Sequence, residues 1–181
     1  MANGQIFSET SQTSYPKASN MQKLSWDNNL ATLAQRWVNQ CLFQHDSNEN
    51  KRIPPFGFVG QNLYWFTTSG SFPSIRQIYS DALKGWFEEY KDFPVENIKP
   101  FTLSQGPAMT GHFTAMAWAT TSKVGCGMIK MIRSSRTEVI VACNYGPGGN
   151  IIGGGFSMYE PGNPCSRCPQ GLNCIEGLLC G

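Results

Sequence analysis

The fold is decided by one stretch of sequence, Gly111-His112-Phe113-Thr114-Ala115-Met116-Ala117-Trp118-Ala119-Thr120-Thr121. From Phe113 onward its apolar residues recur at i, i+3, i+4 and i+7, the spacing of one helix face. His112 precedes this stripe by one residue, so we expect its ring at the border between a packed face and a cleft. Thr110 is a suitable residue to cap the helix start. The stretch therefore predicts a helix over 111–121 that presents a histidine at the edge of a cleft.

Two longer helices are predicted on the N-terminal side of this stretch. Apolar residues at helical spacing predict one helix over 28–42, and Asp27 is a suitable N-cap for it. The same spacing predicts a second helix over 74–91, with Pro73 in its first turn. Between the two helices, the aromatic-rich segment 60–67 is typical of a short strand.

Strands dominate the C-terminal side. The pattern predicts strands over 124–132 and 139–144, and the residues between them, Arg133-Ser134-Ser135-Arg136, fit a hairpin turn. A third strand is predicted over 154–159. Helices and antiparallel strands in mixed order favour an α+β sandwich in which helices cover a sheet.

Size and composition exclude several classes of protein. A chain of 181 residues is one domain of ordinary size with room for a small appendage. Its net charge of +2 is too weak to indicate binding to nucleic acid or to an anionic membrane. No apolar run approaches the roughly 18–20 residues of a membrane span.

Cysteine usage indicates an oxidising compartment. The chain has seven cysteines, most of them close to the C-terminus. The spacing Cys165-x-x-Cys168 also suits a zinc site, but Cys174 and Cys180 do not form a matching pair and no histidine is near. Disulfides are therefore favoured. The start of the chain, residues 1–4, lacks the features of a signal peptide, so we expect a mature or truncated form of a secreted protein.

Two stretches resemble the signatures of a known family. Residues 111–118 resemble the first signature of the CAP superfamily (cysteine-rich secretory proteins, antigen 5 and pathogenesis-related 1), and residues 141–150 are similar to the second. Shorter motifs agree in order, namely Leu24-x-Trp26, Ala34-x-x-Trp37, Cys41-x-x-x-His45, Gly60-x-Asn62-Leu63 and Trp86-x-x-Glu89. The resemblance implies a secreted three-layer α-β-α sandwich. It places a CAP domain at 1–159 and a cystine-stapled hinge tail, similar to that of arthropod venom allergen 5-like proteins, at 160–181.

The resemblance also implies a cleft. In the family this cleft is lined by two histidines and two glutamates, which correspond to His45, His112 and Glu89 here, with Gln61 in place of the second glutamate. A neutral amide neither binds a cation nor takes a proton well. The histidines are then either polar residues at the rim of the core or, with Glu89, an open site for zinc or another divalent cation. The protein is expected to require no cofactor.

The family's cysteine pairing assigns the disulfides. The resemblance implies bonds Cys126–Cys143, Cys165–Cys174 and Cys168–Cys180. The partner of Cys41 in relatives corresponds to Met131, so we expect Cys41 to be a buried free thiol. The first family helix also has no counterpart here. The apolar surface that it covers is then either exposed or covered by residues 1–20, and exposed patches of this kind favour association or ligand uptake.

We expect the protein to act by binding and not by turnover. One binding mode is a small apolar ligand, a sterol or a fatty acid, held between helices or by the loop with Phe93, Ile98 and Phe101. The alternative for these three residues is that they anchor the loop to the body. A second mode is recognition of a host protein by loops on a rigid scaffold. The alternative from another class is a metal-dependent hydrolase that uses His45, His112 and Glu89.

Overall fold

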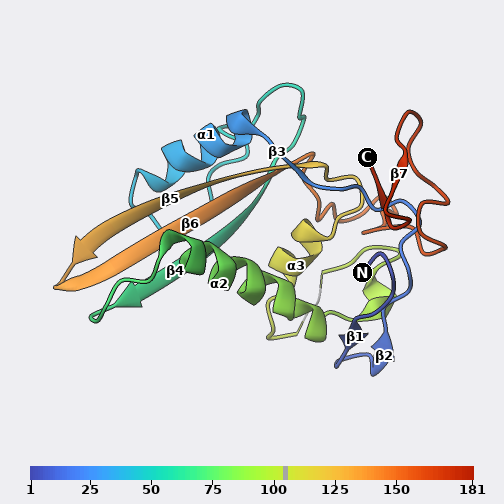
Figure 1. Ribbon diagram of the computed structural model, residues 1–181, viewed down its shortest axis with the longest axis horizontal. Coiled ribbons are helices and arrows are strands. Elements are labelled where there is room, and N and C mark those ends of the chain that lie inside the picture. Colours follow the sequence, from blue (N-terminus) through green and yellow to red (C-terminus); the bar gives the residue numbers. More distant parts are fainter. Residues whose placement is uncertain (104–105) are drawn as a thin grey trace.

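The computed structural model describes residues 1–103 and 106–181. Within this part of the chain the main sheet has the strand order β3-β5-β6-β4 (Figure 1). Strand β6 (Arg136–Gly146) pairs antiparallel with β4 (Gly60–Thr68) on one side and with β5 (Lys123–Arg133) on the other. The short β3 (Ser25–Trp26) lies parallel to β5.

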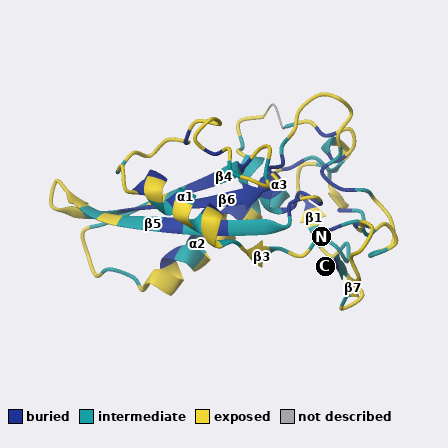
Figure 2. Cartoon of the chain, turned by 90° about the horizontal axis from the view of Figure 1, so that it is seen from above, coloured by how far each residue is buried: buried dark blue, intermediate teal, exposed yellow. Residues whose placement is uncertain are grey.

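Helices cover both faces of this sheet. Helix α1 (Asn28–Val38) lies on one face, and α2 (Ile75–Glu88) and α3 (Gly111–Met116) lie on the other (Figure 1). Alternate residues of β6 face the two layers, as expected for a strand. Ile140 and Ala142 pack against α1, whereas Val139 and Val141 pack against α2. Figure 2 shows β6 and β4 as a buried band between the helices. The predicted α-β-α sandwich is confirmed.

Two glycines let α1 lie directly on β5. A Cβ atom at Gly125 would be 2.1 Å from the backbone nitrogen of Ala31, and one at Gly127 would be 2.5 Å from the Cα of Gln35. Both distances are far shorter than van der Waals contact, so only glycine permits this approach.

The helix starts were predicted better than the helix ends. Asp27 caps α1 as predicted, because its carboxylate accepts hydrogen bonds from the backbone N–H groups of Asn29 and Leu30 at 2.9 Å. The helix ends at Val38 and not at residue 42, because the chain turns over Asn39 and reaches a left-handed φ of 60° at Cys41. Helix α2 likewise ends early, and a 3-10 turn (η1, Glu89–Lys91) replaces its predicted last turn.

Helix α3 ends at Met116, so the prediction of a helix to residue 121 is wrong. Tertiary hydrogen bonds take over the backbone after the helix: Ala119 donates to the carbonyl of Met158 at 2.8 Å and accepts from Gln22 at 3.1 Å. Of the residues expected on the packed helix face, Phe113 and Ala117 are buried, whereas Thr120 is exposed in the loop that follows the helix. Periodicity alone could not detect these distant partners.

The strand predictions are confirmed for β4, β5 and β6 but not for residues 154–159. Ser134 and Ser135 both adopt positive φ, which closes the tight β5–β6 hairpin at the predicted turn. Residues 154–159 are all described and form no strand. Gly153, Gly154 and Gly155 all have positive φ, so this segment begins as a series of turns. Two small pairs complete the described elements, β1 (Phe7–Ser8) with β2 (Thr13–Ser14) and β7 (Cys174–Ile175) with β8 (Leu179–Cys180).

A second core lies beneath α3, and it holds the loop expected to bind ligand. Phe93, Ile98 and Phe101 expose 0%, 2% and 3% of their surface and pack among aromatic rings that include Phe113 and Trp118. The loop, which contains the short turn η2 (Val95–Asn97), is thus anchored to the body. The expectation that these three side chains offer a surface to a ligand is corrected, because none of them is accessible.

Three disulfides are present, Cys126–Cys143 across β5 and β6, and Cys165–Cys174 and Cys168–Cys180 within the tail. These are the pairs that the family resemblance implies. Cys41 has no disulfide partner among the described residues. It is half-exposed, so the expectation of a buried thiol is wrong, because the chain has left α1 before this position. The described helices include none that is long and apolar enough to cross a membrane.

Candidate functional site

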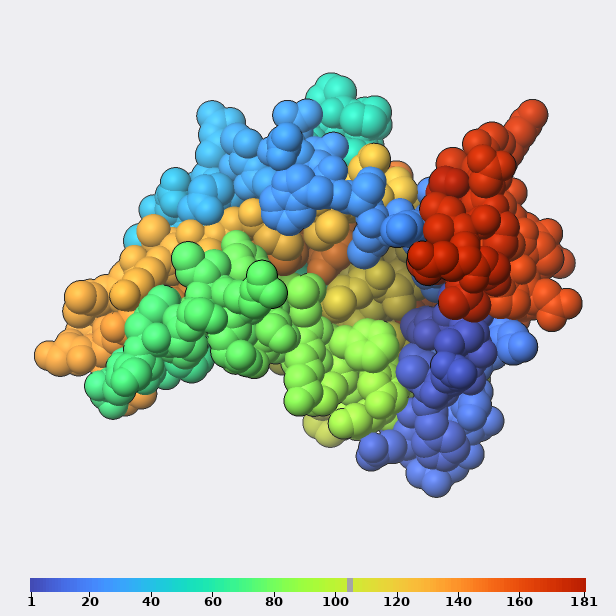
Figure 3. All heavy atoms as spheres, in the orientation of Figure 1, coloured from blue at the N-terminus to red at the C-terminus, as the bar shows by residue number. Residues whose placement is uncertain are grey.

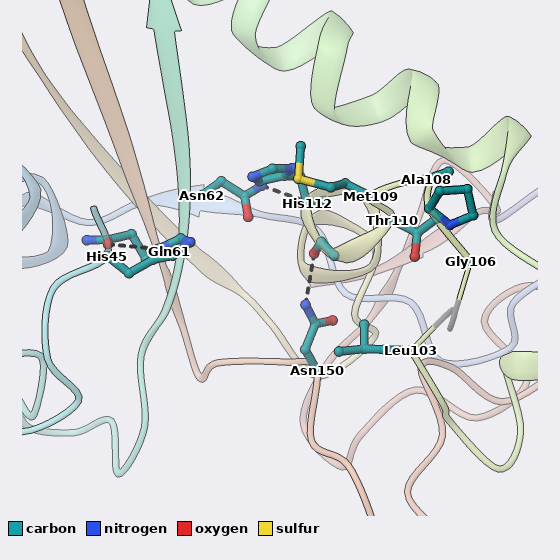
Figure 4. Close-up of a pocket in the computed structure, with 12 residues that line it drawn as sticks. His45, Gln61, Asn62, Leu103, Gly106, Ala108, Met109, Thr110, His112 and Asn150 are labelled. Atoms are coloured by element: carbon teal, nitrogen blue, oxygen red, sulfur yellow. Dashed lines mark hydrogen bonds between the residues drawn. The ribbon is translucent and has the colours of Figure 1, made fainter. Parts of the chain in front are cut away.

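Both histidines line one cavity of about 430 Å³, which we call the histidine cleft (Figure 4). His45 comes from the loop after α1 and His112 from the first turn of α3. Gln61 and Asn62 at the start of β4 lie between them, and Asn150 closes another side. The sequence-predicted imidazoles therefore meet at one site although they are far apart in the chain.

Glu89 holds His112 by its ring and its backbone. The Oε1 atom of Glu89 lies 2.6 Å from His112 Nδ1, and Oε2 accepts hydrogen bonds from the N–H groups of His112 at 3.0 Å and Phe113 at 3.1 Å. The carboxylate therefore caps α3, where an acceptor with negative charge is favoured. Thr110, the predicted cap, makes no capping hydrogen bond with its side chain among the described residues. The ring of His112 is also stacked on Trp86, with centroids 6.0 Å apart.

Gln61 orients His45 in a similar way. Its Nε2 donates to Asn144 Oδ1 at 3.1 Å, so its Oε1 is the atom that faces the loop. This oxygen accepts the backbone N–H of Asp46 at 3.0 Å and lies 3.2 Å from His45 Nδ1 (Figure 4). The Nδ1 atom of His45 is therefore the protonated nitrogen in the neutral ring.

The same tautomer follows for His112, because its Nδ1 faces a carboxylate oxygen. In both neutral rings the proton is on Nδ1 and the lone pair is on Nε2. This is the arrangement by which outer partners orient imidazoles as metal ligands. Each Nε2 atom can thus use its lone pair to bind a cation or to accept a hydrogen bond.

The environment lowers the pKa of His45. Partial burial of the ring is the main cause, and the positive charges of Lys51 and His112 act in the same direction. The hydrogen bond with Gln61 opposes them. Lys51 is itself buried, and its Nζ donates to the carbonyl of Asp46 at 3.0 Å. His45 therefore favours the neutral form that a metal ligand requires.

The predicted ligand set of two histidines and a glutamate is not assembled. Both oxygens of Glu89 are engaged by N–H groups. Across residues 1–103 and 106–181, no three histidine, cysteine or acidic residues are grouped so that they can hold a metal ion. The residues present supply two imidazole ligands, and the carboxylate serves to orient one of them.

Sequence reasoning did not assign roles to two asparagines of the cleft. Asn62 donates to the carbonyl of His112 at 3.1 Å and contacts the hydroxyl of the buried Tyr145 at 3.3 Å. Asn150 has a positive φ and donates to the carbonyl of Gly111 at 2.8 Å. Both residues stand in the motifs that carry the family resemblance, which was the available signal. Asn62 thus joins α3 to β4, and Asn150 joins it to the loop after β6.

A second cavity of about 440 Å³ is lined in part by Met116, the last residue of α3. We call it the arm–tail cavity, because the N-terminal arm and the C-terminal tail form two of its walls. Phe87 of α2 and Met116 of α3 form the wall on the body side. The other apolar residues that line it are Met1, Ala2, Met21, Leu24, Ala117, Leu178 and Leu179, and the polar ones are Asn3, Gln22 and Glu176.

An α-β-α sandwich with a cleft lined by paired histidines and a cystine-stapled tail defines the class of protein. The family model CAP, the cysteine-rich secretory protein family, matches residues 14–145. The chain belongs to the CAP family.

Similar proteins include relatives with allergen and toxin names. The chain is 44% identical over 168 residues to "CRISP/Allergen/PR-1" of Trittame loki, a match that covers 93% of this chain and 40% of the relative. It is 33% identical over 176 residues to scoloptoxin SSD976 of Scolopendra dehaani, covering 97% of this chain and 77% of the relative. The chain thus spans only about two-fifths of the first of these relatives.

Solved structures show the same fold. The crystal structure of Na-ASP-1 matches with a TM-score of 0.78 and 31% identity, covering 99% of this chain and 43% of that one. The crystal structure of NaASP2 with Zn²⁺ matches with a TM-score of 0.77 and 31% identity, covering 98% and 86%.

Proposed function

We propose that the protein is an extracellular binding protein that holds a small apolar ligand, a sterol or a fatty acid, in the arm–tail cavity. The observation that carries this proposal is the cavity itself. Its volume of about 440 Å³ lies within the range of ligand pockets, roughly 300–1,000 Å³. Its walls are mostly methionine, leucine and phenylalanine side chains, and methionine adapts to ligands of different shape.

The site differs from the one expected from the sequence. The loop residues Phe93, Ile98 and Phe101 are already packed in the core. Phe87 and Met116, by contrast, are respectively exposed and half-exposed at the cavity wall. Burial of such side chains by a ligand would remove apolar surface from water, which favours binding.

Titration with a fluorescent sterol, dehydroergosterol, and a fluorescent fatty acid, cis-parinaric acid, tests the proposal. Saturable binding of one of them is expected, and Phe87→Ala should weaken it about tenfold, the effect of about 1.4 kcal/mol of lost apolar contact. Met109→Ala is the matched control, because Met109 is exposed and lines the histidine cleft instead. No saturable uptake of either probe, or equal weakening by both variants, would refute the proposal and favour a host protein as the partner.

A divalent cation at the histidine cleft is the second candidate. It is favoured by the two histidines that line one cavity and by the likeness to NaASP2, whose structure was solved with Zn²⁺. Zinc bound there would be held by His45 and His112 and would act as a Lewis acid. Calorimetry with zinc alone tests this, and His112→Ala should abolish the binding.

Glu89 and Gln61 are poorly suited to act as a general base in the histidine cleft. A general base must have a free acceptor within reach of a substrate proton. Both oxygens of Glu89 already accept hydrogen bonds, and Gln61 is a neutral amide that cannot take a proton at ordinary pH. We therefore propose no general-base role for Glu89 or Gln61.

A further inference from the structure

We propose that the outer edge of β4 is the surface by which two copies of this chain associate. The two β4 strands pair antiparallel around a two-fold axis at Phe66, so that the two sheets become one. This inference goes beyond the binding function proposed above and concerns a different surface, residues 64–68, which we call the β4 edge.

The β4 edge lies at the margin of the molecule. β4 is the last strand in the order β3-β5-β6-β4, and among the described strands none pairs with its outer side (Figure 1). Trp65, in the middle of the strand, exposes 46% of its surface. In Figure 3 the end of β4 lies with the β5–β6 hairpin at one end of the molecule, opposite to the N-terminal arm and the C-terminal tail. A partner can therefore approach this edge without meeting either of them.

The pairing of the β5–β6 hairpin fixes which backbone groups of β4 point outward. Arg133 and Arg136 are directly opposite and close a two-residue turn, so they exchange hydrogen bonds with each other. Every second residue of β6 from Arg136 therefore bonds to β5, and the residues between them bond to β4. The β4 partners of these intervening residues are Asn62, Tyr64, Phe66 and Thr68. The backbone groups of Leu63, Trp65 and Thr67 then face away from the sheet.

Hydrogen bonds within the chain agree with this assignment and show which outward groups are open. The indole N–H of Trp86 donates to the carbonyl of Leu63 at 3.0 Å, so this outward carbonyl is satisfied. Over the part of the chain that the structure describes, no hydrogen bond reaches the backbone N–H or C=O of Trp65 or Thr67. Each of these two residues thus offers one donor and one acceptor along the β4 edge.

The opposite edge of the sheet is protected, whereas the β4 edge is not. On the outer side of β5, the side-chain amide of Gln35 donates to the carbonyl of Met128 and accepts from its N–H, both at 3.0 Å. β3 pairs with the start of β5, and the exposed Lys130 follows Met128 by two residues. These features block pairing with another chain, as natural edge strands commonly do. In contrast, the nine residues of β4 include no charge and no proline and favour strands, which is typical of an edge that pairs.

The arrangement of the open groups favours a second copy as the partner. Trp65 and Thr67 lie symmetrically about Phe66, so an axis at Phe66 places Trp65 opposite Thr67 of the second copy, and the reverse. Each of these pairs then exchanges both hydrogen bonds. This register uses the open groups and does not need the occupied carbonyl of Leu63. Because the strand is uncharged, the pairing brings no like charges opposite each other.

The side chains support the same register. Phe66 meets its counterpart at the axis, and aromatic pairs across neighbouring strands are stabilising. On the other face, Trp65 lies beside Thr67 of the second copy, whose hydroxyl accepts from Arg136 at 3.1 Å. The guanidinium is thereby brought close to the exposed indole, a favourable cation–π arrangement. Phe43, which lies against Trp65 with ring centroids 6.4 Å apart, extends this apolar surface.

Sedimentation equilibrium over a wide concentration range tests the association, and we expect a reversible equilibrium of monomer and dimer. Thr67→Pro removes one intermolecular donor from each copy and should raise the Kd of the dimer at least about tenfold. The fold should survive, because proline is tolerated on an edge strand whose N–H faces solvent. Trp65→Lys keeps every backbone group and places a charge on the same edge, so it should weaken the dimer as well.

Two controls separate the β4 edge from other effects. Thr67→Val keeps the N–H and loses only the hydroxyl. Ile132→Pro makes the same backbone change on the outer side of β5, where Ile132 is 79% exposed. Both should dimerise nearly as the wild type does. A wild type that stays monomeric at every concentration would overturn the proposal and favour a strand of another protein as the partner, and a dimer that Thr67→Pro and Trp65→Lys both leave intact would overturn it too.

Disulfide trapping tests the register. In a Cys41→Ser background, Phe66→Cys should yield a disulfide-linked dimer, because directly opposite residues of a non-hydrogen-bonded pair are close enough to be bridged. Cys126 and Cys143 are directly opposite in the sheet and are bonded in this way. Tyr64→Cys is the matched control, because its counterpart would lie roughly 14 Å further along the second strand, out of reach. No bridging of Phe66→Cys, or equal bridging of Tyr64→Cys, would overturn the axis at Phe66.

Discussion

Glu89 and His112 are joined at two points, by the 2.6 Å contact between Oε1 and Nδ1 and by the 3.0 Å hydrogen bond from the backbone N–H to Oε2. Glu89 stands directly after α2, and His112 is in the first turn of α3. One carboxylate therefore ties two helices together and orients a ring of the cleft. Glu89 does not itself line the histidine cleft, and its hydrogen bonds make it first of all a structural group.

This relationship predicts that Glu89→Gln destabilises the fold. The change removes the negative charge at the start of α3, and it replaces one carboxylate oxygen by an NH₂ group, which cannot accept from His112 Nδ1–H if the remaining oxygen keeps the two capping N–H groups. The free energy of unfolding should fall by about 1–3 kcal/mol, the cost of losing a hydrogen bond to a charged group. Thermal and urea unfolding measure the effect.

Glu88→Gln provides the control for this experiment. Glu88 is half-buried, and its ion pair with Lys84 is 3.9 Å long. Its loss should change stability by less than about 0.5 kcal/mol. Equal effects of the two changes would show that Glu89 is not the cap that holds α3.

Gln61→Glu should convert the cleft to a stronger cation site. A carboxylate beside His45 Nδ1 raises the pKa of the imidazole and its basicity as a ligand. Zinc affinity measured by calorimetry should rise at least about tenfold, the usual effect of such outer partners. The new carboxylate also faces Asn144 Oδ1, so a small loss of stability is expected. Unchanged affinity would mean that Gln61 does not orient the ligand atom of His45.

His45 should make stability depend on pH. Its folded pKa lies below the ordinary histidine value of 6.5, mainly because the ring is partly buried. As the pH falls below 6.5, the unfolded chain takes up this proton before the folded protein does, so folding becomes less favourable. The contribution is complete above 6.5 and is lost as the pH falls through the folded pKa. Chemical unfolding at several pH values should show this slope, and His45→Gln should remove it.

The sequence was sufficient where local chemistry decides the structure. Asp27 caps α1 because a short acidic side chain at that position needs no distant partner. Ser134 and Ser135 close the turn between β5 and β6 by their own backbone conformation, which also needs no distant partner. The end of α3 could not be predicted, because it depends on hydrogen bonds with Gln22 and Met158. The role of Glu89 was also hidden, because a carboxylate near a histidine suits a metal site and a helix cap equally well.

Cys41 should be a single reactive thiol. Six of the seven cysteines form bonds within the chain, and Cys41 is half-exposed after α1. A thiol reagent should therefore modify one group per folded chain, and no more after denaturation without reductant. Cys41→Ser should abolish the signal. A count of zero in the wild type would show that Cys41 is bonded to another molecule.

Phe101→Ala should destabilise the protein, because the loop that contains Phe93 and Phe101 is part of the core. The ring is 3% exposed and meets Trp118 edge-on, with centroids 4.7 Å apart. Its removal leaves a cavity beneath α3, and the free energy of unfolding should fall by about 3–5 kcal/mol. Ligand uptake by the protein that remains folded should match that of the wild type, because the arm–tail cavity does not include Phe101. A variant with wild-type stability and impaired uptake would instead restore the loop as a ligand site.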